Sequence, residues 1–128
     1  MERKINSEKG INFLCRLEAQ RNASEAIKLD PLEERMLICL ATAWHVGKEI
    51  TVLEAMRSCS QMSSTTAHRR LKSLRKKGVV DFSIDEDDNR IKYVRPTDIA
   101  QQYFANIWQC IKDVSADQSH SHKLRHGL

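Results

Sequence analysis

Apolar positions along the first part of the chain recur at helical spacing. From about Ser7 to Lys28 they form a modest stripe, which predicts a first helix with a largely polar surface. Asp30–Glu33 then combines a residue that caps free backbone N–H groups, a proline at the first helical position and a glutamate three residues after the cap. The next stripe predicts a second helix to His45 or Val46, which Gly47 ends.

Two further helices follow at short intervals. After a brief extended segment, Thr51–Glu54 repeats the capping pattern and opens a short helix that ends near Ser58. A tight turn comes next, and Ser63 is placed to cap a longer helix that runs to Lys77. Gly78 is placed as its left-handed C-terminal stop. A short helix, a turn and a longer helix predict a helix-turn-helix.

After Gly78 the spacing of apolar positions changes from that of a helix to the two-residue alternation of a β-strand. The alternating segments Val80–Ile84 and Ile91–Arg95 are joined by six polar residues, which predicts a β-hairpin. Thr97 is placed to cap a final helix with a wide and bulky apolar stripe. The element order predicts a mainly α fold with a small β-hairpin, a winged helix-turn-helix with flanking helices.

Length and composition agree with a small globular protein. The chain has 128 residues, of which 41% are apolar and 30% charged, so one domain with a real core is expected. No apolar run reaches the roughly 18 residues of a membrane span, and residues 1–4 lead into no signal-peptide core. We expect a soluble protein in the cytoplasm, with no membrane partner.

The positive charge of the chain is concentrated in one stretch. The formal net charge is +4, from 21 cations and 17 acids. The segment from Ser63 to Gly78 contains no acid and six cations: Arg69, Arg70, Lys72, Arg75, Lys76 and Lys77. A local patch of this kind attracts a polyanion, although a charge run is often only a solvated helix face.

The helix that carries this stretch has two chemically different faces. Ala67, Leu71 and Leu74 fall together on a helical wheel and should face the core. The opposite face carries hydroxyls and cations, and Arg69 there can form a bidentate pair with guanine in a DNA major groove. The predicted DNA-binding residues of this helix are Ser63, Ser64, Thr65, Thr66, His68, Arg69, Lys72, Ser73 and Lys76.

These motifs resemble the MarR (multiple antibiotic resistance regulator) family of bacterial transcription factors over about residues 30–115. Ser63–Arg69 resembles the opening of that family's recognition helix, and Leu74–Val80 its passage from helix to wing. Asp85–Thr97 resembles its wing. The resemblance implies a homodimeric DNA-binding protein that recognises a pseudo-palindromic operator in double-stranded DNA and is associated with the bacterial nucleoid.

The resemblance also implies a role for the tip of the wing. Arg90 would enter the DNA minor groove, with Asp88 orienting it. Asp87 departs from the family pattern because it replaces the usual first wing arginine, and it leaves four acids in succession at 85–88. Since an acidic wing repels phosphate, its contact with DNA should be weak, or the wing should serve another partner.

Dimerisation is implied by the resemblance and supported by the last helix. A winged-helix core alone does not require so many bulky residues after the wing, so we interpret them as a dimer interface. The other interpretation is that they pack against Leu14 and Ile27 of the same chain. The predicted dimer residues are Leu14, Tyr103, Phe104, Ile107, Trp108 and Ile111. The predicted organisation is a dimerisation helix at 1–29, a winged helix-turn-helix DNA-binding domain at 30–96, a C-terminal dimerisation helix at 97–115 and a flexible tail at 116–128.

Other candidate chemistry is weak. The four cysteines contain no CxxC pair, so zinc ribbons and fingers are not expected, and Cys15 is expected to be a buried structural thiol. Asp85–Asn89 imitates a calcium loop, but Arg90 stands where the glycine belongs. Three histidines near the C-terminus form no second cluster. We therefore expect no metal, no cofactor and no catalytic residue, and predict that the protein is not an enzyme.

The sequence thus predicts sequence-specific double-stranded DNA binding by a dimeric, MarR-like transcriptional regulator. Two alternatives remain. One is a winged-helix protein-interaction module that uses its acidic wing, and the other is a thiol-based redox-responsive regulator that uses Cys15. No motif identifies a small-molecule effector, although the resemblance leaves room for one.

Overall fold

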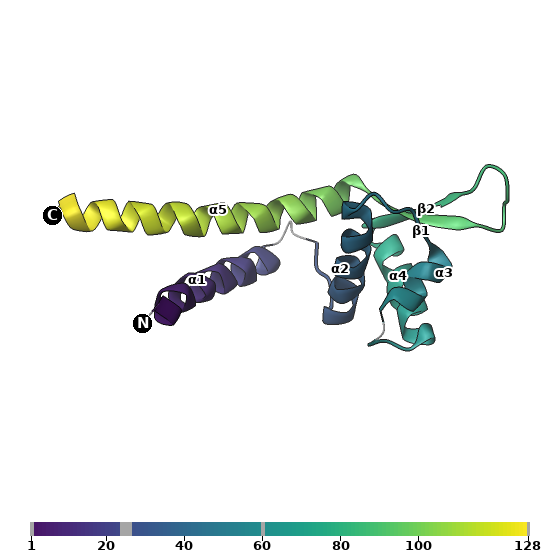
Figure 1. The fold of residues 1–128 in the computed structure, drawn as a ribbon, viewed down its shortest axis with the longest axis horizontal. Coiled ribbons are helices and arrows are strands. Elements are labelled where there is room, and N and C mark those ends of the chain that lie inside the picture. Colours follow the sequence, from purple (N-terminus) through teal and green to yellow (C-terminus); the bar gives the residue numbers. More distant parts are fainter. Residues whose placement is uncertain (1, 24–26, 60, 128) are drawn as a thin grey trace. The chain divides into compact units, whose positions relative to one another are not determined.

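The computed structural model describes the backbone of residues 2–23, 27–59 and 61–127 (Figure 1). Its elements, in chain order, are α1 (Glu2–Asn22), α2 (Pro31–His45), β1 (Ile50–Thr51), α3 (Val52–Ser58), α4 (Ser64–Lys76), β2 (Val80–Ile84), β3 (Lys92–Pro96) and α5 (Asp98–Gly127). They form two compact units. One unit spans Lys28–Gln101, and the other combines α1 with the part of α5 that follows Gln101.

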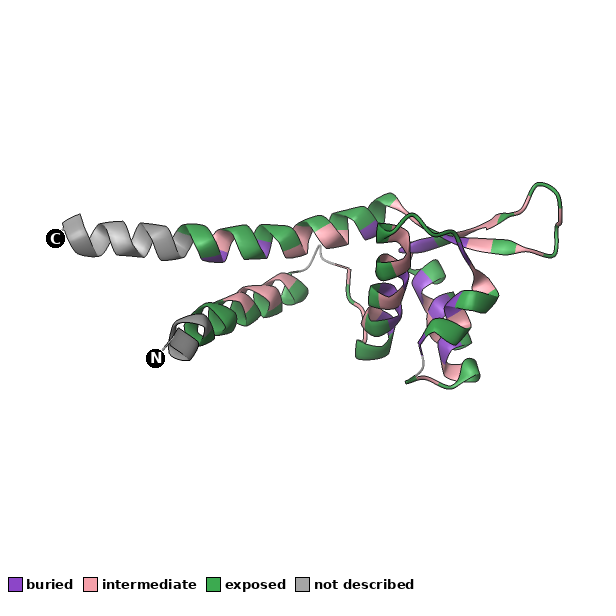
Figure 2. Cartoon of the chain, in the orientation of Figure 1, coloured by how far each residue is buried: buried purple, intermediate pink, exposed green. Residues whose placement is uncertain are grey.

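The Lys28–Gln101 unit is a winged helix-turn-helix. Its buried core joins α2, α3 and α4 to the sheet (Figure 2) and contains Met36, Leu37, Leu40, Ile50, Ala55, Ala67, Leu71, Leu74, Val79, Val80 and Val94. The indole Nε1 of Trp44 donates a 3.1 Å hydrogen bond to the carbonyl of Val94, which fastens α2 to β3. The predicted mainly α fold with a wing is confirmed.

The sheet is larger than the predicted hairpin. It has three antiparallel strands in the order β1-β3-β2. Strands β2 and β3 form the predicted hairpin, with Val80 opposite Pro96 and Ile84 opposite Lys92. Ile50 pairs with Val94 on the other edge of β3. Both of these residues are 2% exposed, and buried backbone polar groups need partners, so the extended segment before α3 becomes a strand.

The helix boundaries follow the predicted caps. The Asp30 carboxylate accepts a 2.7 Å hydrogen bond from the Glu33 backbone N–H, and the Glu33 carboxylate accepts one of 2.7 Å from Asp30. Thr51 and Glu54 form the same reciprocal pair at the start of α3. Both capping boxes are therefore confirmed, and they hold the first turns of α2 and α3.

Gly78 ends α4 as the sequence predicts. Its φ is +79°, and its N–H donates to Arg75 O while the Val79 N–H donates to Leu74 O, which together form a Schellman motif. A Cβ added at Gly78 would lie 3.0 Å from Cδ1 of Ile99. The position thus requires glycine for its backbone conformation and for its close contact with α5.

Three expectations need correction. Helix α1 begins at Glu2 rather than Ser7 and ends at Asn22. Residues 24–26 of the longer predicted helix lie outside the described residues. Helix α5 continues to Gly127, so it includes residues 116–127 of the segment predicted as a flexible tail. No proline or glycine interrupts the helix before Gly127, so polar composition alone does not end it.

Candidate nucleic-acid interface

Helix α4 separates its two faces as predicted. Ala67, Leu71 and Leu74 are fully buried against the rest of the Lys28–Gln101 unit. Ser63 is exposed just before α4, and the predicted contact residues that lie exposed within α4 itself are Ser64, Thr65, His68, Arg69, Lys72 and Lys76. They form one continuous outer face of α4, which we call the α4 face. It carries hydroxyl, imidazole and cationic groups and no carboxylate.

Ser63 and Thr66 have a structural role at the start of this helix. The Ser63 Oγ accepts a 3.2 Å hydrogen bond from the Thr66 N–H and donates one of 3.0 Å to Thr66 Oγ1. Ser63 is the N-cap, and Thr66 is half-buried. These two predicted contact residues therefore hold the first turn of α4, and Ser64 and Thr65 project from that turn.

Ser73 does not belong to the α4 face. Its hydroxyl donates to the Glu33 carboxylate, and the side chain is half-buried between α4 and α2. The Nζ of Lys77 donates to the same carboxylate at 2.6 Å. The helical wheel placed Ser73 on the polar face, but its partner Glu33 comes from another helix and draws the side chain inward.

Glu33 is the only buried charged residue among the described side chains, at 1% exposure. Burial raises the pKa of its carboxyl, but hydrogen bonds from Lys77, Ser73 and the Asp30 backbone, together with the Lys77 charge, outweigh burial and lower the pKa. The group stays ionised and ties the start of α2 to the back of α4. Sequence reasoning used Glu33 only as a capping residue and missed this role.

The cations of α4, with that of its C-cap Lys77, divide into two groups. Three have partners within the unit: Arg70 pairs with Asp30 at 3.2 Å, Lys77 pairs with Glu33, and the Arg75 guanidinium lies 4.6 Å from the centre of the Phe82 ring. The other three are Arg69, Lys72 and Lys76, which make no ion pair with any described residue. Among these cations, those without an ion pair or ring contact to any described residue are thus the three that lie on the α4 face.

At the tip of the wing, the cation Arg90 is held by the acid Asp88. Both the Nε and an Nη of Arg90 donate to the Asp88 carboxylate, at 3.0 and 3.1 Å, while the Arg90 side chain remains 90% exposed. These bonds lower the pKa of Asp88 and raise the pKa of Arg90. The orienting contact that the family resemblance implied is therefore present, and the guanidinium is presented to solvent.

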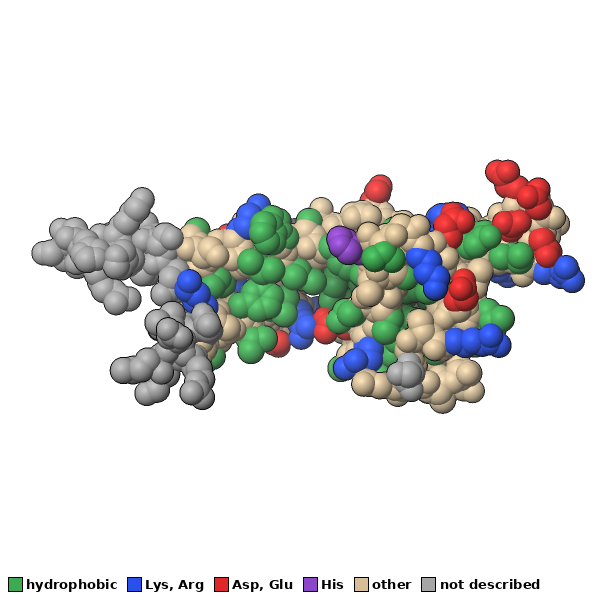
Figure 3. Space-filling model, in the orientation of Figure 1, with side chains coloured by type: hydrophobic (Ala, Val, Ile, Leu, Met, Phe, Trp, Pro, Cys, Tyr) green, Lys and Arg blue, Asp and Glu red, His purple; other side chains and the backbone are tan. Residues whose placement is uncertain are grey.

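Asp85 organises the loop of the wing. Its carboxylate accepts backbone hydrogen bonds of 3.0 Å from Asp87 and Asp88 and a 3.0 Å bond from the Tyr93 hydroxyl, which raises the pKa of Tyr93. Glu86 and Asp87 are exposed. Acidic side chains gather at the wing tip next to a cation (Figure 3). Asp85 and Asp88 thus have structural roles in the loop. Glu86 and Asp87 remain exposed and give the tip of the wing its negative charge.

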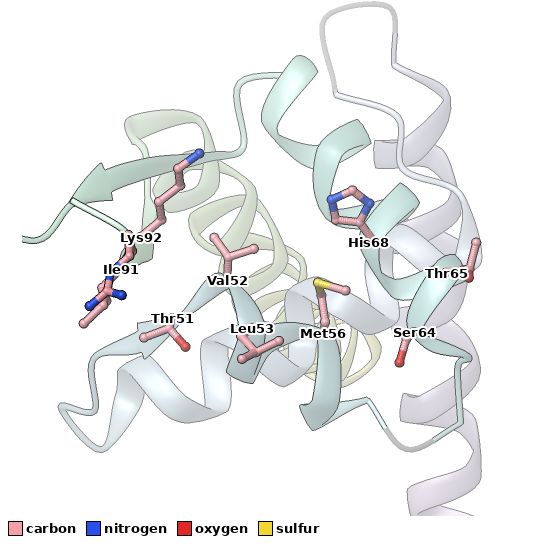
Figure 4. Close-up of a pocket in the computed structure, with 10 residues that line it drawn as sticks. Thr51, Val52, Leu53, Met56, Ser64, Thr65, His68, Ile91 and Lys92 are labelled. Atoms are coloured by element: carbon pink, nitrogen blue, oxygen red, sulfur yellow. The ribbon is translucent and has the colours of Figure 1, made fainter. Parts of the chain in front are cut away.

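A groove connects α4 with the base of the wing. It has a volume of about 780 Å³ and receives side chains from α3, from the first turns of α4 and from the start of β3 (Figure 4). Thr65 and His68 line it on the α4 side, and Arg90 and Lys92 on the wing side. Val52, Leu53 and Met56 of α3 add apolar side chains to its lining. Two predicted contact surfaces therefore meet in one concavity.

The predicted dimer residues lie in the unit formed by α1 and α5. Leu14 and Trp108 are 61% and 57% exposed, and Ile111 is 40% exposed. Tyr103, Phe104 and Ile107 are half-buried, with the first two rings in edge-to-face contact at 6.0 Å. Large apolar side chains thus remain exposed on both α1 and α5. Packing within one chain does not cover them.

The other candidate chemistry gains no support. The described residues contain no group of three or more histidine, cysteine or acidic side chains placed to hold a metal ion. None of the described helices is both long and apolar enough to cross a membrane. Cys15 is exposed, so the expectation that it is a buried structural thiol is wrong. Most of the α1 surface is polar and exposed, and Cys15 lies on that exposed surface.

The chain is similar in structure to several solved proteins. No protein-family model and no curated sequence matches the chain. A MarR-like transcriptional regulator from Thermotoga maritima matches with a TM-score of 0.59 and 16% identity over 94% of this chain and 82% of that one. MepR of S. aureus, solved as a DNA complex, matches with a TM-score of 0.57 and 16% identity over 98% and 90%. The heme sensor PefR of Streptococcus agalactiae, solved with heme, gives 0.55 and 15% over 91% and 76%.

At these identities the likeness is one of fold. The chain has the winged helix-turn-helix fold of these regulators, with α1 before the winged unit in the sequence and α5 after it. The resemblance to MarR regulators that the motifs suggested is confirmed at the level of the fold.

Proposed function

We propose that this protein is a transcriptional regulator that binds double-stranded DNA with sequence specificity, as a homodimer. The observation that carries the proposal is the division of cations on α4. Arg70, Arg75 and Lys77 are engaged inside the unit, whereas the cations of the α4 face make no ion pair with described residues. Cations that the fold does not use are available to a polyanion. The fold shared with MepR, which was solved as a DNA complex, supports the same interpretation.

In this proposal α4 enters the major groove. Arg69 pairs with a guanine, and Lys72 and Lys76 neutralise backbone phosphates. Ser64 and Thr65 lie at the N-terminus of α4, where free backbone N–H groups also favour a phosphate. The groove beside them then receives the DNA backbone, and Arg90 reaches the adjacent minor groove. Ser73 has no role in this contact because Glu33 holds it.

The proposed homodimer is formed by α1 and α5. A second copy would cover the exposed Leu14, Trp108 and Ile111, which a lone chain leaves in water. Two-fold symmetry would present two copies of α4 to half-sites about one DNA turn apart, so the operator would be pseudo-palindromic. The protein would act in the cytoplasm at the nucleoid, as a regulator and not as an enzyme.

Binding to DNA is tested by selecting a preferred duplex from a random library and measuring affinity by fluorescence anisotropy. We expect Arg69→Ala to weaken binding to the selected duplex by about 1–3 kcal/mol and binding to random duplex by less. Lys112→Ala removes one exposed positive charge from α5 and serves as the control, with affinity unchanged. Equal losses on both duplexes would make Arg69 a phosphate contact, and a wild-type protein that selects no duplex would refute the proposal.

The dimer is tested separately by analytical ultracentrifugation. Trp108→Asp places a charge in the proposed apolar interface, where desolvation costs several kcal/mol, so we expect monomer or aggregate. Ser115→Asp adds the same charge at an exposed polar position of α5 and should leave the dimer intact. A soluble dimeric Trp108→Asp variant would show that α5 is not the interface.

A second function is favoured by the wing alone. Glu86 and Asp87 are exposed at its tip, which suits a basic protein surface better than phosphate. A wild-type protein that binds no duplex but retains its fold would favour this interaction module. A small-molecule effector and a regulatory oxidation of Cys15 stay predictions.

A further inference from the structure

Two cysteines meet inside the winged unit, and the proposed function does not use them. Cys39 lies on α2, and Cys59 is the C-cap of α3. Their sulfur atoms are 2.6 Å apart, which is about half an ångström longer than the roughly 2.05 Å of a disulfide bond. Both are free thiols. Only a small displacement therefore separates this pair from a covalent bond.

The two thiols differ in access. Cys59 is 3% exposed, whereas Cys39 is half-buried, so an oxidant from solvent meets Cys39 first. Burial and the contact with Cys39 raise the pKa of Cys59 to about 12, which keeps that thiol protonated. Cys39 is therefore placed to react first, and Cys59 is placed to resolve the product at contact distance.

We propose that Cys39 and Cys59 are a redox-active pair that a hydroperoxide converts to an intramolecular disulfide. Cys39 loses its proton and attacks the peroxide as the thiolate; the O–O bond breaks, the sulfur gains OH as a sulfenic acid, and the other peroxide oxygen takes up that proton and leaves as alcohol or water. The Cys59 sulfur then attacks the sulfenic sulfur, the S–S bond forms, and water leaves with the Cys59 proton. Two thiols are oxidised by two electrons, and one peroxide is reduced. A reducing thiol reverses the bond.

The bond would tie α2 to the end of α3. The loop that it closes contains β1 and α3, and the Cys59 carbonyl already accepts the Met62 N–H in the turn toward α4. Closing a loop of about 20 residues without distorting the fold restricts mainly the unfolded chain. We expect the oxidised protein to melt about 10 °C higher than the reduced protein. This inference does not rest on DNA binding, and its test contains no DNA.

The full-length protein is treated with a slight excess of hydrogen peroxide, free thiols are alkylated, and tryptic peptides are identified by mass spectrometry. We expect Met36–Lys48 joined to Ser58–Arg69, with loss of the link on reduction. Cys39→Ser and Cys59→Ser should each abolish the linked peptide, whereas Cys110→Ser should retain it. The rise in Tm should occur in wild type and in Cys110→Ser alone among these proteins.

Cys15 is the internal control, because it is exposed in the same chain. Oxidation of Cys15 with complete alkylation of Cys39 and Cys59 would overturn the proposal. A linked peptide without a rise in Tm would show that the bond does not fit the native fold, and this result would overturn it as well.

Discussion

Replacement of Glu33 tests whether one buried carboxylate positions α4. Glu33 is 1% exposed and accepts bonds from Ser73, Lys77 and the Asp30 backbone. Glu33→Gln keeps the size of the side chain and an acceptor oxygen for the capping box, but it removes the negative charge. The Lys77 ammonium then lies beside a neutral amide. The loss in free energy of unfolding therefore reports the ion pair between α2 and α4.

The expected loss in free energy of unfolding follows from the exposure of Glu33 and Lys77. Removing one partner of a fully buried ion pair costs about 3–5 kcal/mol because the other charge is left uncompensated. The Lys77 side chain is 36% exposed, so water can solvate its ammonium after the substitution. We therefore expect Glu33→Gln to lower the free energy of unfolding by about 2 kcal/mol at pH 7, below the range for a fully buried pair.

The loss should depend on pH with a defined sign. The folded-state pKa of Glu33 is lowered, so the ion pair contributes fully above the unfolded pKa near 4.5 and is lost as pH falls through the folded pKa. The glutamine variant has no such titration. The difference between wild type and Glu33→Gln should be constant above about pH 6 and should shrink below about pH 4.

Urea unfolding monitored by circular dichroism at pH 7 and pH 3 measures both effects. Glu54→Gln is the matched control, since Glu54 closes the same kind of capping box on α3 but its side chain is 48% exposed. We expect no measurable change for this control. Equal effects of the two substitutions, or a Glu33→Gln deficit that does not change with pH, would show that the ion pair of Glu33 with Lys77 does not stabilise the fold.

Three further changes test other parts of the structure. Gly78→Ala should lower the free energy of unfolding by about 1–2 kcal/mol in urea titrations because φ is +79°, whereas Gly10→Ala should not lower it; similar results for both would contradict the Schellman assignment. Asp87→Arg should tighten DNA binding and steepen the fall of log K with log salt by about one to two per dimer in a salt series; an unchanged slope would mean that the wing does not approach DNA. Trp44→Phe should cost about 1 kcal/mol in unfolding free energy through loss of the bond to Val94, and no loss would show that the bond is not stabilising.

The sequence alone determines those features whose partners lie within a few residues. Asp30 with Glu33 and Thr51 with Glu54 form their capping boxes over three residues, and Gly78 closes α4 on its own last turn. Local patterns of this kind are readable because backbone geometry brings such neighbours together in any helix or turn. The two faces of α4 are readable for the same reason, since helical periodicity alone places them.

The tertiary structure decided which of the predicted groups are free to contact a partner. Ser73 and Lys77 are drawn to Glu33 across 40 and 44 residues, and the third strand exists only because Ile50 meets Val94. The contact of Cys39 with Cys59 arises in the same way. Such pairs depend on how whole helices and strands pack, and burial of apolar faces fixes that packing without specifying which polar side chains meet. The sequence therefore predicts α4 and its two faces, and packing decides which of its cations find a partner among the described residues.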